Sequence, residues 1–310
     1  MRICLIYNKQ AGAADLISKF MFHLDAEHRC ELRTTSTEQH AGLIAREAVK
    51  EGYDRIVAAG GDGTLNQIVN GIAPDFDAVE LALLPLGTGN DLGRVLNLSV
   101  DNQDEACARA LSRHVEPVDV IRIFSADSYS YCINVANGGM GGRVAMDVKP
   151  EDKKRWGAMA YWITSISRLV DLSSYQATLT LDGRDYREHT LCIAVANGRF
   201  VGGGFPIAPR AMLNDGFLDV TVVPVLPIFE LMAAGFNFVL ARDHRDDRIR
   251  CYRARSVRIQ TEPIMPFSID GEPARRIDAT FEVIPSALRF VTSHNEPGLL
   301  PADQRGSFIS

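Results

Sequence analysis

The sequence lacks several features that define whole classes of protein. Its 310 residues include six cysteines, and none of them forms a C-x-x-C pair. This spacing argues against a disulfide framework and against a zinc site made of thiolates. We expect these cysteines to be small buried apolar residues in a reducing compartment. No uncharged apolar run reaches 18 residues, so no membrane-spanning helix is predicted.

Excess positive charge is also missing. Lys and Arg number 33 against 39 Asp and Glu, and the net charge of −6 argues against a dedicated nucleic-acid binder. The seven histidines show no metal-ligand spacing. The N-terminus begins with a strand pattern, so we expect no signal peptide and a cytoplasmic protein.

What the sequence does have is a glycine-rich corner after a short β-branched run at residues 55–60. The apolar residues that follow recur at the spacing of one helical face, which predicts strand, turn and helix (Leu65, Ile68, Val69, Ile72). Glycines permit positive φ and close approach to a ligand, and a helix N-terminus favours phosphate. Asp62 lies between Gly61 and Gly63, and a carboxylate beside phosphates indicates a divalent cation held between them.

Strand and helix patterns alternate through the first third of the chain. Strands are predicted at 2–8, 30–35, 55–60 and 81–85, with helices at about 13–27 and 37–50. This alternation predicts a doubly wound parallel sheet, whose ligands bind outside the carboxyl ends of the strands. Four candidate site segments follow these strands, at residues 8–9, 34–35, 60–64 and 87–91.

The fourth of these units repeats the logic of the third. After the strand at 81–85 come Thr88, Asn90 and Asp91, followed by a short helical pattern. Asn90 or Asp91 as a simple helix cap is the alternative to a ligand site. Arg94 lies one helical turn beyond Asp91 and could pair with it, or form a plain surface ion pair.

From about residue 115 the pattern changes to many short strands separated by turns. They are predicted at 118–124, 129–136, 176–181, 189–196, 217–223, 256–260, 266–270, 281–284 and 288–292. Helices are predicted at 158–171 and about 227–242. This pattern indicates a second, largely antiparallel β domain, sandwich-like or barrel-like.

Three motifs occur together in a specific order: GGDGTLN at 60–66, LGTGND at 86–91 and IDGE at 269–272. The set resembles the diacylglycerol kinase catalytic-domain family, in particular bacterial lipid kinases related to sphingosine and ceramide kinases. The resemblance implies an N-terminal ATP-binding α/β domain over 1–122 and a β-rich lipid-acceptor domain over 123–286. The segment 287–310 is a candidate to pack back on the first domain, and the active site is expected in the interdomain cleft.

The resemblance also implies roles for individual residues. Asn8 and Lys9 match the turn after the first strand, where Lys9 replaces the usual proline, and Thr35 matches a nucleotide-contacting threonine. The ATP phosphates would contact the glycine-rich segment and Thr88; the segment comprises Gly60, Gly61, Asp62, Gly63, Thr64, Leu65 and Asn66. Asp62, Asp91 and Asp119 resemble carboxylates that organise Mg²⁺.

Further roles carry alternatives. Arg94 and either Lys153 or Lys154 resemble the basic members of the charge network, with a solvated basic turn as the alternative for the lysines. Asp270 resembles the catalytic base, with Glu272 as the competing assignment and a plain Asp-Gly hairpin turn as the structural alternative. Met212, Asp215 and Phe217 resemble a structural Mg²⁺ loop, for which a metal-free Asx turn is the alternative.

The function implied is an ATP- and Mg²⁺-dependent lipid kinase acting on a hydroxyl of a diacylglycerol-like lipid. The alternatives are a kinase of another hydroxyl (phosphatidylglycerol, a sphingoid lipid or NAD) and a nucleotide-binding regulatory protein without transfer activity. Peripheral contact with a membrane surface is expected at the basic segment 244–258 rather than at the apolar segment 226–241, which is better explained as a buried helix. A dimer is compatible with the sequence.

Overall fold

The computed structural model describes residues 1–9, 14–35, 40–98, 102–125, 128–139, 173–227, 229–231, 233–234, 248–274, 278–293 and 298–301. The chain divides into two units. Unit 1 comprises Met1–Val120, Leu213–Asp215 and Ile284–Ser310, and unit 2 comprises Ile121–Met212 and Gly216–Val283. Among the described residues, no helix has the length and apolarity needed to cross a membrane.

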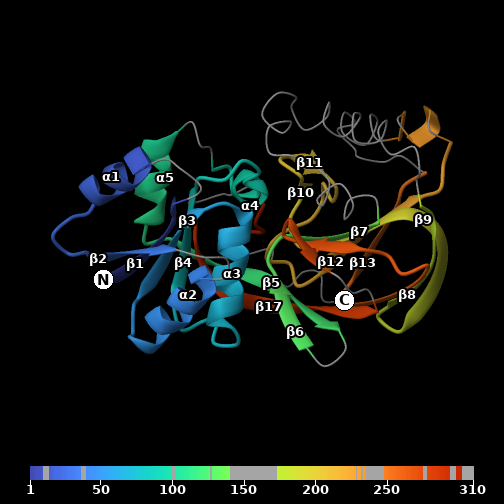
Figure 1. Ribbon diagram of the computed structural model, residues 1–310, viewed down its shortest axis with the longest axis horizontal. Helices are drawn as coiled ribbons and strands as arrows, with labels where there is room; N and C mark the ends of the chain where they lie inside the picture. The colour runs from blue at the N-terminus through green and yellow to red at the C-terminus, as the bar shows by residue number, and fades with distance from the viewer. Residues whose placement is uncertain are drawn as a thin grey trace. The chain divides into compact units, whose positions relative to one another are not determined.

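Unit 1 contains a parallel sheet in which strands β4, β3, β1 and β2 lie side by side in this order (Figure 1). These strands are β1 (Arg2–Asn8), β2 (Arg29–Thr35), β3 (Arg55–Gly60) and β4 (Glu80–Pro85). Both β1 and β3 have buried interiors, as expected for strands covered on both faces. The doubly wound parallel sheet predicted from the alternating pattern is therefore confirmed.

Four helices of unit 1 form two pairs, α1 with α5 and α2 with α3, on opposite faces of the sheet (Figure 1). The helices are α1 (Ala14–Phe22), α2 (His40–Lys50), α3 (Asp62–Ile72), α4 (Asp91–Val95) and α5 (Gln103–Ala110). Right-handed crossovers require this arrangement, since the chain runs outward from β1 to β2 and then back to β3. β1 and β3 therefore flank the topological switch point, where ligands bind in such sheets.

Two helix predictions need correction. α1 ends at Phe22 rather than near residue 27, because the chain turns at His23, whose N–H bonds back to Lys19 and Phe20. α5 is absent from the prediction, because four of its eight residues are polar or charged and its apolar stripe is narrow. Its N-terminus is capped by Asn102, whose Oδ1 accepts from the backbone N–H of Glu105 at 3.3 Å.

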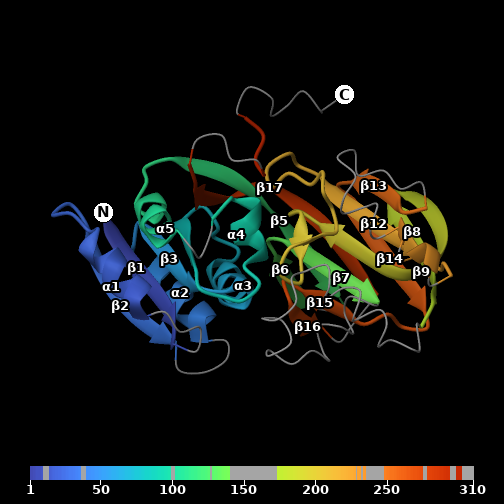
Figure 2. The same cartoon turned by 90° about the horizontal axis from the view of Figure 1, so that it is seen from above.

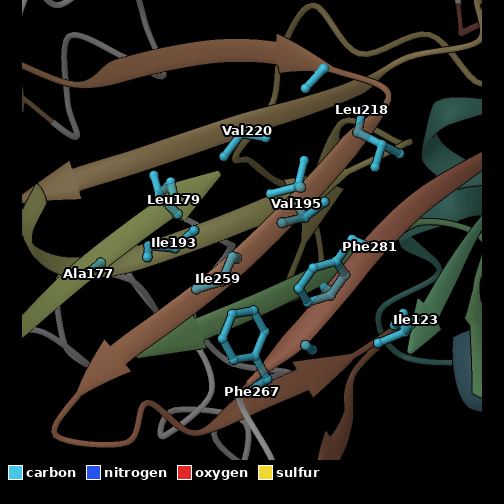
Figure 3. Close-up of a cluster of buried hydrophobic side chains, with 14 of the residues drawn as sticks. Ile123, Ala177, Leu179, Ile193, Val195, Leu218, Val220, Ile259, Phe267 and Phe281 are labelled. Carbon is cyan, nitrogen blue, oxygen red and sulfur yellow. The ribbon is translucent and has the colours of Figure 1, made fainter. Parts of the chain in front are cut away.

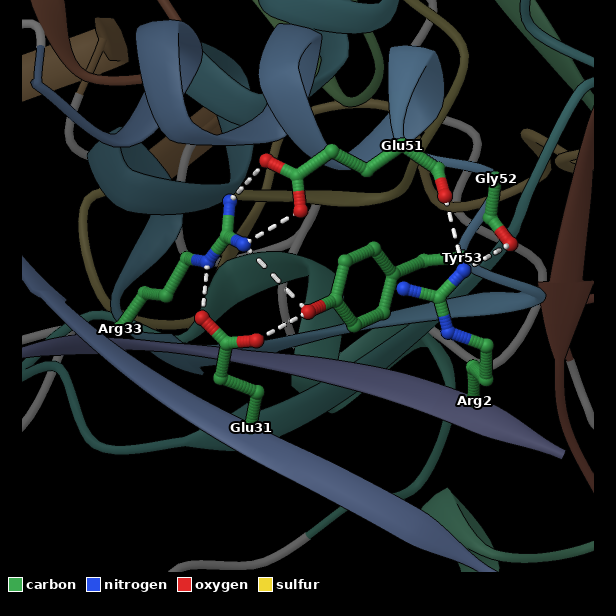
Figure 4. A network of polar contacts seen from close by, with 6 residues as sticks. All are labelled: Arg2, Glu31, Arg33, Glu51, Gly52 and Tyr53. Atoms are coloured by element: carbon green, nitrogen blue, oxygen red, sulfur yellow. Dashed lines mark hydrogen bonds and ion pairs between the residues drawn. The ribbon is translucent and has the colours of Figure 1, made fainter.

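The outer strand β2 of this sheet carries a network of polar side chains (Figure 4). Arg33 donates to both carboxylate oxygens of Glu51, at 3.0 and 2.6 Å, and to Glu31 at 2.8 Å. The guanidinium groups of Arg2 and Arg33 also lie against the ring of Tyr53, at 4.6 and 5.3 Å. Charges along an outer strand discourage pairing with another chain.

Unit 2 consists mainly of antiparallel strands. They include β6 (Ser128–Cys132), β7 (Val135–Gly139), β8 (Tyr175–Leu181), β9 (Arg184–Ala196), β12 (Leu218–Pro224), β13 (Arg250–Ala254), β14 (Ser256–Glu262), β15 (Phe267–Ile269) and β16 (Glu272–Ala274). A short pair is formed by β10 (Phe200–Val201) and β11 (Phe205–Pro206). The β15–β16 hairpin lies beside β7 (Figure 2). The predicted antiparallel β domain is confirmed.

The core of unit 2 gathers apolar side chains from most of these strands (Figure 3). Phe267 and Phe281 form a tilted pair in this core, with ring centroids 5.7 Å apart and planes 31° apart. Leu179, Ile193 and Val220 are fully buried in the same core. Burial of side chains of this size stabilises the fold by about 1.5–3 kcal/mol each.

Two strands, β5 (Val115–Ser125) and β17 (Ala279–Val291), contribute residues to both units. β17 is one strand where two were predicted, at 281–284 and 288–292, and the left-handed Ser286 lies between the two predicted parts without ending the strand. In unit 1 its residues Arg289 and Phe290 pair in parallel with β4.

The single strand predicted over 129–136 is also wrong. β6 ends at Cys132 and β7 begins at Val135, because the backbone N–H groups of Ile133 and Asn134 bond to a side-chain carboxylate instead of a neighbouring strand. β13 is missing from the prediction, which treated its residues as part of a basic surface segment.

Candidate functional site

The two glycine-rich turns that follow β3 and β4 pack directly against each other in unit 1. A Cβ added to Gly87 would lie 2.5 Å from the Cα of Gly61, and one added to Gly61 would lie 3.0 Å from the Cα of Gly87. Gly61 has φ −96°, so its role here is close approach rather than the positive φ that glycine also permits. The left-handed residue is instead Asn90, with φ 48°.

Asp62 connects the two turns through hydrogen bonds. Its Oδ2 accepts from the backbone N–H of Asp91 at 3.1 Å, and its Oδ1 accepts from that of Leu92 at 3.3 Å. The cap of α4 therefore comes from the neighbouring turn, while Asn90 makes no side-chain cap bond and donates from Nδ2 to the carbonyl of Gly87 at 2.5 Å. The structure thus brings the two predicted acidic residues together.

The turn after β1 joins this group at the switch point. Asn8 donates from Nδ2 to the hydroxyl of Thr64 at 3.2 Å, and Thr35 is the register partner of Asn8 on β2. Gly60 must also be glycine, because a Cβ there would lie 2.5 Å from Oγ1 of Thr64. Lys9 directly follows β1 and is exposed.

The remaining predicted phosphate-contacting residues differ in environment. Thr88 is exposed in the second turn, whereas the side chain of Leu65 is only 1% exposed and belongs to the core. Asn66 accepts from Asn70 along α3. Arg94 is exposed and donates from Nε to the carbonyl of Gly89 at 3.3 Å rather than to Asp91.

Asp119 is fully buried in unit 1. Its Oδ1 accepts from the backbone N–H of Ser286 at 2.7 Å, and its own N–H donates to the carbonyl of Leu213 at 2.6 Å. Ser286 has φ 53°, a conformation that needs support from its surroundings. Asp119 therefore anchors two distant segments of unit 1.

The predicted Mg²⁺ loop lies at 212–217. Asn214 exchanges two hydrogen bonds with Leu300, at 3.0 and 2.6 Å, and the N–H of Leu213 donates to Gly298. In unit 2, the ring of Phe217 lies 4.5 Å from the guanidinium of Arg253, and Met212 Sδ lies 3.0 Å from Nη2 of Arg199. Within the described residues, no group of three or more His, Cys, Asp and Glu side chains could hold a metal.

Asp270 lies in unit 2 at the two-residue turn between β15 and β16, with φ 47° at Asp270 and 88° at Gly271. Positive φ at both positions defines the hairpin turn that Asp-Gly favours. The Asp270 side chain is turned inward and only 5% exposed, whereas Glu272 is exposed. Lys153, Lys154 and the predicted helix over 158–171 lie outside the described residues.

The carboxylate of Asp270 accepts hydrogen bonds from the break between β6 and β7. The backbone N–H of Ile133 donates to Oδ2 at 2.9 Å, and those of Asn134 and Val135 donate to Oδ1, both at 3.0 Å. The thiol of Cys132 lies 3.0 Å from Oδ1. Sequence reasoning misses these donors, and a local signal for them is the polar Asn134 between the apolar residues Ile133 and Val135.

Comparison with known proteins identifies the family. Residues 2–123 match the diacylglycerol kinase catalytic domain, and residues 134–292 match the YegS C-terminal NAD kinase beta sandwich-like domain. The chain belongs to the YegS-like lipid kinase family. The family predicted from the three motifs is confirmed.

Individual relatives cover nearly the whole chain. A protein of Xanthomonas euvesicatoria named probable lipid kinase YegS-like is 33% identical over 84% of this chain and 85% of its own length. One of the same name from Shewanella frigidimarina is 28% identical over 97% and 96%. The crystal structure of a diacylglycerol kinase from Bacillus anthracis superposes with a TM-score of 0.79, at 25% identity over 94% and 97%.

Proposed function

We propose that this YegS-like family member transfers the γ-phosphoryl group of ATP to a hydroxyl of a diacylglycerol-like lipid, with Mg²⁺ as cofactor. The observation that carries the proposal is the hydrogen-bonded meeting of Asp62 with the start of α4, beside the switch point of the unit 1 sheet. Nucleotides bind at such switch points. The glycines let the two turns pack backbone against backbone, and the N-terminus of α3 that follows Gly61 favours phosphate oxygens.

The donor set fits the proposed cofactor. Asp62 and Asp91 supply the carboxylate oxygens that Mg²⁺ prefers, and Asp91 is buried at 7% exposure. Bound Mg²⁺ would neutralise charge on the phosphates. Asn8, Thr64 and Thr88 add an amide and two hydroxyls that can position phosphate oxygens. Arg94 and one of Lys153 and Lys154 are proposed to add positive charge.

The acceptor hydroxyl needs a proton acceptor. We assign this role to Asp270, whose carboxylate is held in one orientation by the β6–β7 break. The hydroxyl proton passes to the carboxylate while the hydroxyl oxygen bonds to the γ-phosphorus, and the bond from phosphorus to the ADP oxygen breaks. Glu272, exposed in the same hairpin, is the competing base. The interdomain position of the active site stays a prediction.

Two accessory sites are part of the proposal. The loop 212–217 would hold a structural Mg²⁺ through the Asp215 carboxylate and the carbonyls of Met212 and Phe217. In the segment 244–258 proposed for membrane contact, described from residue 248 on, Arg250 pairs with Glu188 and Arg258 with Asp278. In the apolar segment 226–241, Phe229 is 83% exposed while Leu231 is buried. This segment therefore has an exposed apolar side chain as well as a buried one.

The test is a transfer assay with radiolabelled ATP and Mg²⁺ against diacylglycerol, phosphatidylglycerol, sphingosine, ceramide and NAD. Label in diacylglycerol with wild type, lost in Asp270→Asn and kept in Glu272→Gln, is the expected result. Loss only in Glu272→Gln moves the base to Glu272. Label only in another acceptor supports the second function, and ATP binding without any label supports a regulatory protein.

A further inference from the structure

The break between β6 and β7 encloses the carboxylate of Asp270 on the inside of unit 2. Three of its donors are backbone N–H groups, from Ile133, Asn134 and Val135. The fourth is the side chain of Cys132, with Sγ 3.0 Å from Oδ1. Backbone donors remain whatever side chain is present, so among these four contacts that of Cys132 is the one that depends on residue type.

The break is itself held in place by side-chain amides. Asn134 donates from Nδ2 to the carbonyl of Phe200 at 2.9 Å, and Asn197 donates from Nδ2 to the carbonyl of Ile133 at 3.0 Å. The N–H of Asp270 returns a bond to the carbonyl of Val135 at 3.0 Å. The donors around the carboxylate are therefore fixed in position, as a preorganised site requires.

The thiol of Cys132 is suited to act as a permanent donor. Its side chain is fully buried, and this burial, followed by the charge of Asp270, raises the pKa of the thiol well above its ordinary value. The thiol therefore keeps its proton at neutral pH and donates to the carboxylate.

We propose that Cys132 is a positioning residue for phosphoryl transfer, acting through its S–H bond to Oδ1 of Asp270. Three of the four bonds described here end on Oδ1 and one on Oδ2, so the thiol helps to fix the orientation in which the carboxylate meets the acceptor hydroxyl. The inference rests on the proposed function, in which Asp270 is the base.

The experiment compares Cys132→Ser, Cys132→Ala and Cys132→Val with wild type and with Cys107→Ala, a fully buried cysteine of α5 in unit 1. Serine keeps a donor, whereas alanine and valine remove it with different side-chain volumes. Steady-state transfer to diacylglycerol gives kcat and KM for ATP, and thermal unfolding shows that each variant is folded.

We expect Cys132→Ser to stay within about threefold of wild-type kcat, while Ala and Val both lose about tenfold at unchanged KM for ATP, as loss of a bond to a charged group predicts. Cys107→Ala should keep wild-type kcat. Full kcat in a folded Ala variant, or rescue by Val but not by Ser, overturns the inference. Absence of labelled lipid with wild type overturns the proposed function itself, whereas activity indifferent to the Cys132 donor overturns only this inference.

Discussion

The carboxylate of Asp62 accepts a hydrogen bond from the backbone N–H of Asp91, 29 residues further along the chain, at 3.1 Å. This bond joins the two glycine turns that follow neighbouring strands of unit 1. It gives Asp62 a structural duty as the cap of α4 in addition to its proposed part in catalysis. An Asp62→Asn variant separates the capping role from the catalytic role, because the amide oxygen can still accept a hydrogen bond but carries no negative charge.

Asp62→Asn should keep most of the stability and lose most of the activity. The amide oxygen can still accept one of the two N–H bonds, so we expect about 1–2 kcal/mol of destabilisation. Loss of the charge should lower kcat by about 100-fold or more. Denaturant unfolding and the lipid transfer assay measure both, with Asp104→Asn, an exposed residue of α5, as the control. A folded Asp62→Asn variant with wild-type kcat would show that Asp62 is only a cap.

Gly87→Ala should destabilise unit 1, because the new Cβ would meet the Cα of Gly61 at 2.5 Å and backbone on both sides must shift. Overpacking of this kind costs about 1–3 kcal/mol. Gly93→Ala in the adjacent helix is the matched control, since its Cβ meets no atom closer than 3.5 Å, and it should be neutral or stabilising by up to about 1 kcal/mol. Equal melting temperatures for the two variants would contradict the close packing of the turns.

Asp119→Ala should destabilise the protein by about 1.5–3 kcal/mol, because the N–H of Ser286 loses its bond to a charged acceptor and the buried carboxylate is replaced by a smaller side chain. Urea unfolding measures the change, and Asp77→Ala, exposed after α3, should change little. If Asp119 served Mg²⁺ alone, the alanine variant would lose activity without losing stability.

Arg33→Met should lower the melting temperature near pH 7 but not in acid. Hydrogen bonds from Arg33, the largest cause in each case, lower the pKa values of Glu31 and Glu51 below their ordinary 4.5. A carboxyl group whose pKa is lower in the folded than in the unfolded protein stabilises the fold at any pH above its unfolded pKa. This contribution disappears as the pH falls below 4.5 and through the pKa of the folded state. Melting curves at pH 7 and pH 3 test the sign.

The control for that experiment is Arg113→Met, whose exposed pair with Glu27 should contribute little at either pH. A difference between wild type and Arg33→Met that persisted unchanged at pH 3 would mean that packing of Arg33 against Tyr53, rather than its charge, carries the effect.

Much of the fold follows from local pattern. The run at 2–8 matches β1 residue for residue, and the glycine corner before Leu65 predicts the join between β3 and α3, because period and turn chemistry are local properties. The narrow apolar stripe of α5 and the two arginines of β13 make these elements hard to recognise from local pattern, and tertiary packing creates them. The family also follows from the sequence, since its motifs are short and contiguous.

The sequence by itself determined the order of strands and helices and the residues that could carry the chemistry. Only the tertiary structure decided that Asp62 caps α4, that Asp119 anchors Ser286, and that Asp270 interrupts a strand at Ile133, 137 residues away. The physical reason is that a carboxylate accepts from whichever N–H groups the folded chain brings to it. Those groups are backbone atoms, which carry no mark in the sequence.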